Sequence, residues 1–341
     1  MTAGLGIVFA LLCLLGVVMG FRDAPNSVAL PVRFRALTPR LALVMAALLN
    51  GIGVVLGMGL ITLSVSFFTP HVMSGVVGHI TVATAVLVAV AWGLLLWWRR
   101  IPGSTAHALL AALAGAHLAA HLELGHELEP VVMDRVGWEV AVGLLLSPLL
   151  AWGLARVLTP PLVRLGTTGS TVNVQHRARI ALAVSGGATA VGHGVQGGQR
   201  LGLLWAICLM GAGVPPGAPT ASWVFGLSAA VFALAMAVGT LGGAWRIAWT
   251  LTERLVALDP LRAAVAAAVP AGLLFVGSLV LHLPLSSTHT LTAGIVGAGQ
   301  TQTYASVRWP QVLRVVAWWL LTPLACLGAA LLLGLALLLL V

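Results

Sequence analysis

Two short segments of the sequence combine a proline, hydroxyl residues, a histidine and a run of small residues in the same order. The first is PGSTAHALLAALAGA at 102–116, and the second is PLSSTHTLTAGIVGAG at 284–299. In each segment the hydroxyl residues stand where a short helix would begin, beside its unpaired N–H groups and the positive end of its dipole. This chemistry suits an anion, and two matching copies predict an anion site between the segments at the midplane of a membrane.

The candidate anion-binding residues are the hydroxyl residues of both segments, namely Ser104, Thr105, Ser286, Ser287 and Thr288. One copy alone would be explained by helix capping, but two copies at matching positions favour a ligand. His107 and His289 follow the hydroxyl residues, and packing or capping explains them better than ligand binding.

A carboxylate and an amide stand three residues apart in the segment GFRDAPNSVA at 20–29. Asp23 and Asn26 would share one face of a helix, and an ionisable residue at membrane depth is costly and usually functional. Pro25 disfavours a regular helix, so we expect freed backbone groups here that bind a coupling ion together with both side chains. The alternative is a helix cap at the membrane interface.

A second polar segment, GHGVQGGQRLG at 192–202, places Gln196 and Gln199 at the same spacing as neutral donors to the anion. Its glycines would let the backbone approach a ligand, although a glycine-rich kink between helices explains the segment equally well. Arg22 and Arg200 each adjoin a polar segment and are candidate charge-tuning residues. For Arg22, the alternative is a side chain that snorkels to the membrane interface.

The composition indicates an all-α polytopic membrane protein. Hydrophobic residues make up 60% of the chain and charged residues 7%, with a mean hydropathy of +1.07, whereas soluble domains carry about 25% charged residues. The expected spans are 3–19, 41–63, 76–98, 102–117, 138–158, 180–192, 201–214, 221–243, 263–282, 285–299 and 313–340. The short 102–117 and 285–299 segments read as half-helix hairpins supported by protein.

The charge pattern predicts the topology. The net charge is +9 and every basic residue is an arginine; their positions in short loops indicate membrane orientation and not nucleic-acid binding. With the N-terminus outside and five crossings in the first half, most arginine loops fall inside and the acidic loop at 123–134 falls outside. An odd number of crossings with a duplicated motif predicts two inverted-topology repeats, 1–158 and 180–341, joined by a cytoplasmic linker at 159–179.

The remaining reactive residues do not indicate an enzyme. Cys13, Cys208 and Cys326 are scattered in apolar segments and predict neither a disulfide nor a metal site. A further cluster, His117, His121 and His126 near several glutamates, fits a solvated acidic loop better than a metal or pH-sensing site. We find no catalytic nucleophile set, phosphate-cradling ATPase loop or redox-cofactor motif, and no cofactor is expected beyond a co-transported proton or sodium ion.

Taken together, these motifs resemble those of the PiT family of inorganic phosphate transporters over nearly the whole chain. Gly20, Asp23 and Asn26 match the family's G-x-x-D-x-x-N motif, and both hydroxyl segments match its P-x-S-[ST]-[ST]-H motif, through Pro102, Ser104, Thr105 and His107 and through Pro284, Ser286, Ser287, Thr288 and His289. The resemblance implies an inverted-repeat fold and phosphate uptake coupled to sodium or protons. It also implies that phosphate is held between the hairpin tips, with the Asp and Asn residues organising coupling cations.

The sequence departs from this family in its second polar motif. The family usually has H-G-x-N-D-G-Q-K, whereas this chain has H-G-V-Q-G-G-Q-R, so Gln196 replaces Asn and Gly197 replaces a second Asp. Arg22 stands where the family usually has His or a polar amide. The site therefore loses a negative charge, which leaves open proton coupling through Asp23, weaker coupling, or another oxyanion such as sulfate.

The sequence thus predicts a secondary active transporter of inorganic phosphate in the cytoplasmic membrane. One alternative is a permease for sulfate or a related oxyanion. An alternative from another class is a non-transporting anion sensor or a partner-binding membrane subunit. The expected partners are phosphate and membrane lipid, with no nucleic acid, and the apolar 313–340 helix would face lipid or a second copy in a homo-oligomer.

Overall fold

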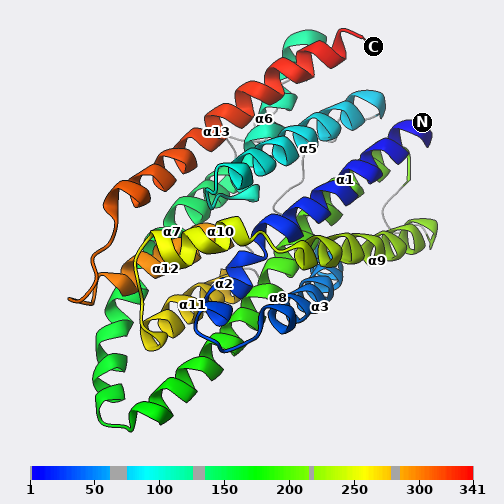
Figure 1. Ribbon diagram of the computed structural model, residues 1–341. Coiled ribbons are helices and arrows are strands. Elements are labelled where there is room, and N and C mark those ends of the chain that lie inside the picture. Colours follow the sequence, from blue (N-terminus) through cyan, green and yellow to red (C-terminus); the bar gives the residue numbers. More distant parts are fainter. Residues whose placement is uncertain (1, 62–74, 126–134, 215–218, 278–284, 341) are drawn as a thin grey trace.

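The protein is a bundle of helices, several of them inclined to one another (Figure 1). The computed structural model describes residues 2–61, 75–125, 135–214, 219–277 and 285–340, and these ranges contain no β-strand. The helices are α1 (Thr2–Asp23), α2 (Pro25–Arg33), α3 (Pro39–Gly59), α5 (Gly75–Trp98), α6 (Thr105–Leu124), α7 (Arg135–Thr167), α8 (Thr171–Gly211), α9 (Pro219–Gly242), α10 (Trp245–Trp249), the π-helix η1 (Thr250–Arg254), α11 (Pro260–Phe275), α12 (Ser287–Gly299) and α13 (Trp309–Leu338). Within those ranges, seven helices are long and apolar enough to cross a membrane, which confirms an all-α polytopic membrane protein.

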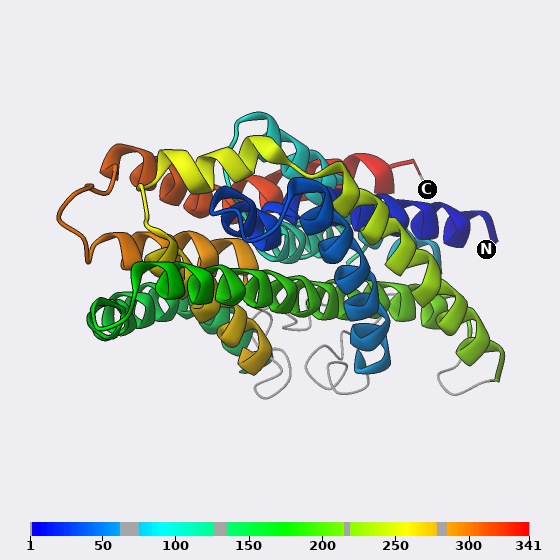
Figure 2. The ribbon, with the colours of Figure 1, turned by 60° about the horizontal axis from the view of Figure 1, so that its bottom comes forward.

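The second polar segment lies in the middle of one continuous helix. Figure 2 shows α8 as a long unbroken rod, and it spans Thr171–Gly211 without interruption. The predicted division into 180–192 and 201–214, with a glycine-rich kink between them, is therefore wrong. Glycine lowers helix stability by about 1 kcal/mol relative to alanine, and close packing against α3 offsets that loss here.

Glycines set the crossing between α3 and α8. A Cβ atom at Gly57 would lie 2.0 Å from the Val195 carbonyl oxygen, and one at Gly198 would lie 2.2 Å from the Val54 carbonyl oxygen. Both helices use small residues spaced by four to bring their backbones into contact, as membrane helices commonly do. In the segment at 192–202, these close backbone approaches are made to a neighbouring helix, whereas the sequence predicted that they would be made to a ligand.

The α1–α2 joint is nearly helical. Ala24 alone separates the two helices, and its backbone is right-handed with φ −47° and ψ −41°. Pro25 has no N–H for the Phe21 carbonyl, four residues earlier. That carbonyl instead accepts a hydrogen bond of 3.2 Å from the Ala244 N–H. The backbone group freed by the proline is thus bound by another segment, whereas the sequence predicted an ion.

The two helices that begin at the hydroxyl segments, α6 and α12, each pack against a helix from the other half of the chain. A Cβ atom at Gly115 of α6 would lie 2.1 Å from the Leu327 carbonyl oxygen of α13, and one at Gly297 of α12 would lie 2.3 Å from the Trp152 carbonyl oxygen of α7. Each glycine stands eleven residues after the serine that begins its helix, and each partner stands four residues after a proline. Each half of the chain therefore contributes a helix that packs on the last long helix of the other half.

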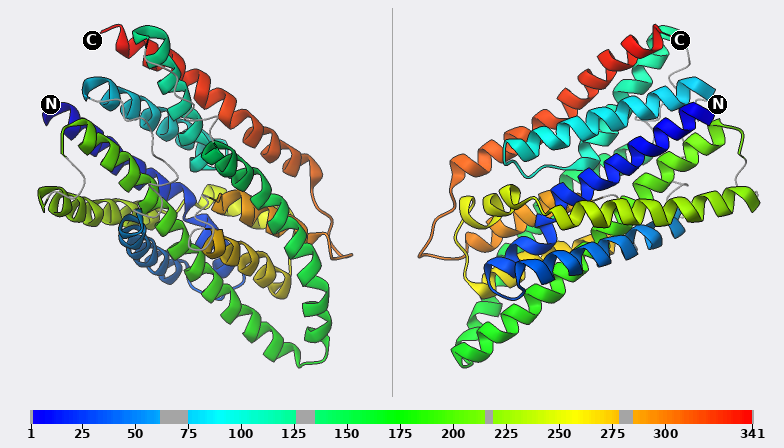
Figure 3. Two further views of the ribbon diagram at one scale, coloured as in Figure 1. Left: turned by 180° about the vertical axis from the view of Figure 1, so that it is seen from behind. Right: turned by 45° about the vertical axis from the view of Figure 1, so that its right-hand side comes forward.

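The predicted linker at 159–179 is mostly helical, because only residues 168–170 separate α7 from α8. In both views of Figure 3 this turn lies at the end of the molecule opposite to the two chain termini. The boundaries of the two proposed repeats stay a prediction.

Several arginine-bearing loops predicted to be cytoplasmic lie beside one another. Arg33 forms an ion pair with Glu253. The Thr250 hydroxyl donates to the Arg100 carbonyl at 2.8 Å, and Arg308 Nη1 donates to the Glu253 carbonyl at 2.9 Å. Loops from both halves of the chain therefore share one face, as a common side of the membrane requires.

Candidate functional site

The two hydroxyl segments begin their helices in the same way. The Ser104 side chain accepts a hydrogen bond from the His107 N–H at 3.3 Å, and the Ser286 side chain accepts one from the His289 N–H at 3.2 Å. Both serines have extended backbones, as N-cap residues do. The serines are thus helix caps, and the remaining N–H groups of both first turns are held at one place in the bundle.

Both helix N-termini open onto one small cavity. It is lined by Asp23, Ser104, Thr105, Ala106, His193, Arg200, Leu285, Ser286, Ser287 and Thr288. All five predicted anion-binding hydroxyl residues are in this set. The cavity measures about 10 Å³, which is room for about one water molecule. A tetrahedral oxyanion therefore fits only if the two helix ends move apart.

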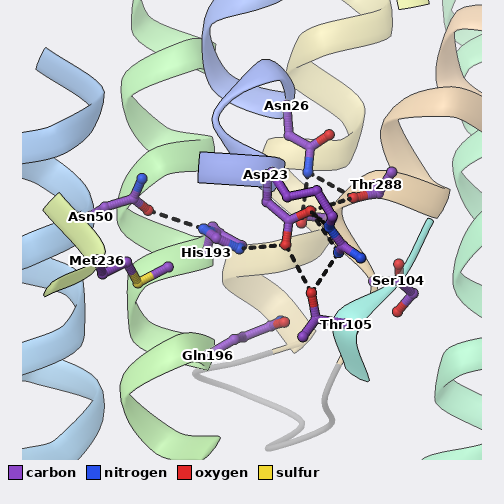
Figure 4. Close-up of polar contacts among 12 residues, drawn as sticks. Asp23, Asn26, Asn50, Ser104, Thr105, His193, Gln196, Met236 and Thr288 are labelled. Carbon is purple, nitrogen blue, oxygen red and sulfur yellow. Dashed lines mark hydrogen bonds and ion pairs between the residues drawn. The ribbon is translucent and has the colours of Figure 1, made fainter. Parts of the chain in front are cut away.

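Asp23 lies at the centre of this cluster (Figure 4). Its Oδ1 accepts hydrogen bonds from Arg22 Nε at 3.0 Å and Nη2 at 2.7 Å, with the Thr288 hydroxyl at 3.5 Å. Its Oδ2 accepts from the Thr105 hydroxyl at 3.1 Å. Asp23 is 5% exposed, and the helix that follows it begins without a side-chain cap hydrogen bond, so Asp23 is a buried acceptor and does not act as a helix cap.

Arg22 is a buried partner of the site and does not snorkel. Its side chain is 2% exposed. Besides Asp23, its Nη2 donates to the Gly103 carbonyl at 3.1 Å and to the Thr105 hydroxyl at 2.5 Å. A guanidinium thus binds a carboxylate, a carbonyl and a hydroxyl oxygen, which are the ligand types preferred by hard cations.

Asn26 connects the α1–α2 joint to the second hydroxyl segment. Its Nδ2 donates to the Ser287 hydroxyl at 3.2 Å and to the Thr288 hydroxyl at 2.8 Å. Asp23 is bound to Thr105 of the first segment. The predicted shared face of Asp23 and Asn26 therefore joins the two segments, which lie about 180 residues apart in the sequence.

His193 is a site residue that the sequence analysis did not select. Its Nε2 lies 3.3 Å from Asp23 Oδ2, and its Nδ1 lies 3.1 Å from Asn50 Oδ1. Asn50 Nδ2 in turn donates to the Thr240 hydroxyl at 3.1 Å. The signal was present, because His193, Gln196 and Arg200 recur at helical spacing on one face. Treating the glycine-rich segment as two pieces hid that face.

The predicted residues of the second polar segment differ in whether they line the cavity. Arg200 lines the cavity, and its Nη2 donates to Gln196 Oε1 at 2.9 Å. Gln196 and Gln199 are not among the residues that line the cavity. Their roles as donors to the anion stay predictions, whereas Arg200 adds positive charge directly to the cavity wall.

His107 and His289 pack against each other behind the helix ends. Their ring centroids are 4.7 Å apart, and His289 stacks on Trp319 at 3.9 Å. Trp319 Nε1 donates to the Pro102 carbonyl at 2.7 Å. This arrangement agrees with the predicted packing role and fixes the first hydroxyl segment to α13.

In the part of the chain that the structure describes, the other candidate residues do not line this cavity. Over the ranges that the structure covers, no three His, Cys, Asp or Glu side chains are grouped to hold a metal. His126, the acidic residues at 127–134 and Pro284 lie outside the described residues. Cys13, Cys208 and Cys326 carry free thiols in helices.

Comparison with known proteins agrees with the resemblance. The sequence matches the phosphate transporter family over residues 19–178 and 163–330. It is 28% identical over 308 residues to the probable low-affinity inorganic phosphate transporter of Bacillus subtilis (strain 168), covering 89% of this chain and 88% of that protein. It is 30% identical over 324 residues to the protein of the same name from Rhizobium meliloti (strain 1021), covering 92% and 90%.

The fold is similar to that of a solved structure described as the sodium-dependent phosphate transporter. The TM-score is 0.65 with 17% sequence identity, and both chains are covered in full. The family and these relatives are transporters, so the prediction that the chain is not an enzyme is confirmed. Because the family match extends over both halves of the sequence, the chain belongs to the phosphate transporter family.

Proposed function

We propose that the protein carries inorganic phosphate across the cytoplasmic membrane as a cation-coupled secondary transporter. The observation that carries this proposal is the single buried cluster in which Asp23 and Asn26 bind hydroxyl groups of both helix N-termini. The names of the relatives, which are inorganic phosphate transporters, support the same substrate.

Phosphate would bind between the two helix ends. Ser104, Thr105, Ser286, Ser287 and Thr288 would offer hydroxyl and backbone donors, and two helix dipoles would add partial positive charge. Arg200 contributes a full charge at the cavity wall. Gln196 and Gln199 would reach the anion once the helix ends separate. Because the cavity has room for about one water molecule, binding requires movement of one half of the chain against the other.

Two observations support inverted-topology repeats as the moving parts. The packing of α6 on α13 and of α12 on α7 relates the two halves by equivalent contacts. The family match also falls into two pieces, one in each half. In this arrangement the cluster lies at the boundary of the repeats, where transporter sites typically lie.

Uptake of an anion needs co-transported cations. Moving one charge against 100 mV costs about 2.3 kcal/mol, so a divalent anion would not accumulate unaided. Asp23 and Asn26 form the proposed coupling-ion site. Arg22 tunes its charge but is covalently fixed, so it cannot accompany the anion across the membrane.

We assign the membrane orientation from the arginine loops. Their common face would be cytoplasmic by the positive-inside rule, which places the N-terminus outside. On α13, exposed apolar residues, including Leu313, Leu320, Leu324 and Leu332, would face lipid or a second copy of the chain.

The test is uptake of radiolabelled phosphate into proteoliposomes, with sodium and proton gradients imposed separately. Uptake that follows one gradient and is lost in Asp23→Asn supports the proposal. Asp259→Asn is the matched control, because this aspartate caps α11 away from the cluster. No phosphate uptake under either gradient by folded protein would overturn it.

The same vesicles separate phosphate from sulfate. Arg22 and the missing second acidic residue make the site more positive, which favours divalent anions such as monohydrogen phosphate and sulfate. Of these two, sulfate has no titratable proton near neutral pH. Competition by sulfate that grows or shrinks with pH would show which anion is preferred. Phosphate binding without accumulation would point to a non-transporting sensor or partner subunit.

A further inference from the structure

The hydrogen-bond directions around His193 follow from its neighbours. The Thr240 hydroxyl donates to the Met236 carbonyl at 2.8 Å, so its oxygen must accept the bond from Asn50. The Asn50 amide nitrogen therefore faces Thr240, and its oxygen faces His193 Nδ1. Because an amide oxygen only accepts, His193 Nδ1 carries a hydrogen.

The opposite nitrogen of the same ring faces a carboxylate. With a hydrogen fixed on Nδ1, a neutral His193 would direct the Nε2 lone pair at Asp23 Oδ2, 3.3 Å away. Two acceptors at this distance in a buried site repel each other. A proton between them removes the conflict, either as imidazolium with carboxylate or as imidazole with carboxylic acid. The Asp23–His193 pair therefore holds one proton in this arrangement.

A sodium ion would meet competition at the same carboxylate. The oxygens that would coordinate it, Asp23 Oδ1, the Gly103 carbonyl and the Thr105 hydroxyl, all accept hydrogen bonds from Arg22 Nη2. The guanidinium is a permanent cation. Arg22 therefore occupies these three oxygen atoms with a positive charge that cannot leave the site. Asp23 Oδ2 remains available to bind a proton.

The other charges near His193 are few. Asp23 and Arg22 face it from α1, and Arg200 lies two turns along its own helix. The α9 sequence has no ionisable residue, and α2, α3 and α11 carry theirs in end turns, at Arg33, Arg40 and Arg262. On α5, His79 Nε2 is bonded to the Cys208 carbonyl, and on α7, Arg156 is bonded to Gln300. Asp23 is therefore the one acidic partner of His193 among the described residues.

We infer that the proton shared by His193 and Asp23 is the cation co-transported with phosphate, and that transport does not require sodium. This inference rests on the proposed function. A proton from water on one side forms the N–H or O–H bond of the pair, and it returns to water on the other side after the helix ends have moved. Nothing is oxidised or reduced, and His193 thereby becomes a coupling residue.

The test measures protons and phosphate together in vesicles that contain the full-length protein, without sodium. A pH-sensitive dye inside reports proton entry, and radiolabelled phosphate reports anion entry. In His193→Gln, we expect the ratio of protons to phosphate, measured over the phosphate that still enters, to fall by one. His79→Gln removes another buried histidine outside the site and should leave the ratio unchanged. Protons that travel on the anion itself would be unaffected by either substitution.

A second variant covers the case in which His193→Gln does not fold. In Asn50→Ala, His193 loses the acceptor that fixes its tautomer, so a neutral ring can donate to Asp23 from Nε2. We expect the same fall in the ratio with His193 retained. An unchanged ratio in the folded variants, or wild-type uptake that requires sodium, would overturn the inference and leave phosphate transport intact. Absence of wild-type uptake and exchange would instead overturn the proposed function.

Discussion

Asn26 Nδ2 donates to the Thr288 hydroxyl at 2.8 Å, which links the α1–α2 joint to the second helix N-terminus. The two residues are 262 positions apart. Opening the cavity for an anion must lengthen this contact or the bond between Asp23 and Thr105 on the other side. The joint thus connects anion binding to the state of the coupling site.

We expect Asn26→Ala to lower phosphate uptake. The substitution removes the two hydrogen bonds that link the coupling site to the second helix end, so the state of Asp23 is no longer transmitted to the anion site. Each 1.4 kcal/mol of coupling free energy lost corresponds to about tenfold in affinity. Initial rates of uptake at low phosphate would measure the loss. Asn173→Ala is the control, because Asn173 is exposed at the start of α8; a loss of equal size in both variants would contradict the prediction.

We expect Arg22→Gln to destabilise the protein and to create sensitivity to sodium. Breaking a buried ion pair typically costs about 3–5 kcal/mol, because the remaining charge is unpaired. The freed oxygens of Asp23, Gly103 and Thr105 would then accept a sodium ion. The Tm of the detergent-solubilised variant should rise when sodium chloride replaces choline chloride, whereas the wild-type Tm should not.

The exposed Arg40 provides the matched control for this experiment. Arg40→Gln should leave both the Tm and its response to sodium unchanged. A sodium-induced rise in the Tm of the wild-type protein would show that Arg22 does not occupy the cation ligands.

We expect opposite effects from two glycine substitutions on α3. A Cβ atom at Gly57 would lie 2.0 Å from the Val195 carbonyl oxygen, so Gly57→Ala forces the helices apart at a cost of about 1–3 kcal/mol. At Gly59 nothing lies within 4 Å, and Gly59→Ala should be neutral or stabilising by up to about 1 kcal/mol through helix propensity. Equal Tm values for the two variants would argue against the α3–α8 crossing.

A pH dependence is expected from the Asp259 cluster at the start of α11. Burial by itself raises the pKa of Asp259, but hydrogen bonds from Tyr304 and Arg262 outweigh burial and hold this pKa below its usual value. A depressed folded-state pKa means that the contribution to stability is present above the unfolded-state pKa, about 3.9, and is lost as the pH falls.

The Tm of the wild-type protein should therefore decrease in acid more steeply than that of Asp259→Asn.

For Tyr304, burial and the hydrogen bond to Asp259 raise the pKa to about 12. Its contribution is present below the unfolded-state pKa of about 10 and is lost as the pH rises through about 12. Tyr304→Phe should remove this alkaline component; a wild-type curve with no such component would show that the cluster is open in solution.

The sequence by itself determined the class of protein and predicted most residues of the candidate site. Its hydropathy required membrane helices, and the duplicated hydroxyl segments required two equivalent helix N-termini, because caps and dipoles are local properties. The three-residue spacing of Asp23 and Asn26 likewise placed both side chains on one face.

Only the tertiary structure decided what those groups contact. The polar segment of α8 stays helical because α3 packs against its glycines, which no local propensity encodes. Arg22 is buried because Gly103 and Thr105, about 80 residues away, provide its acceptors. His193 becomes a site residue because Asn50 and Thr240, on two other helices, fix its protonation. Spacing along the chain predicts which residues share a face, whereas hydrogen bonds between distant helices decide which charges and protons that face can hold.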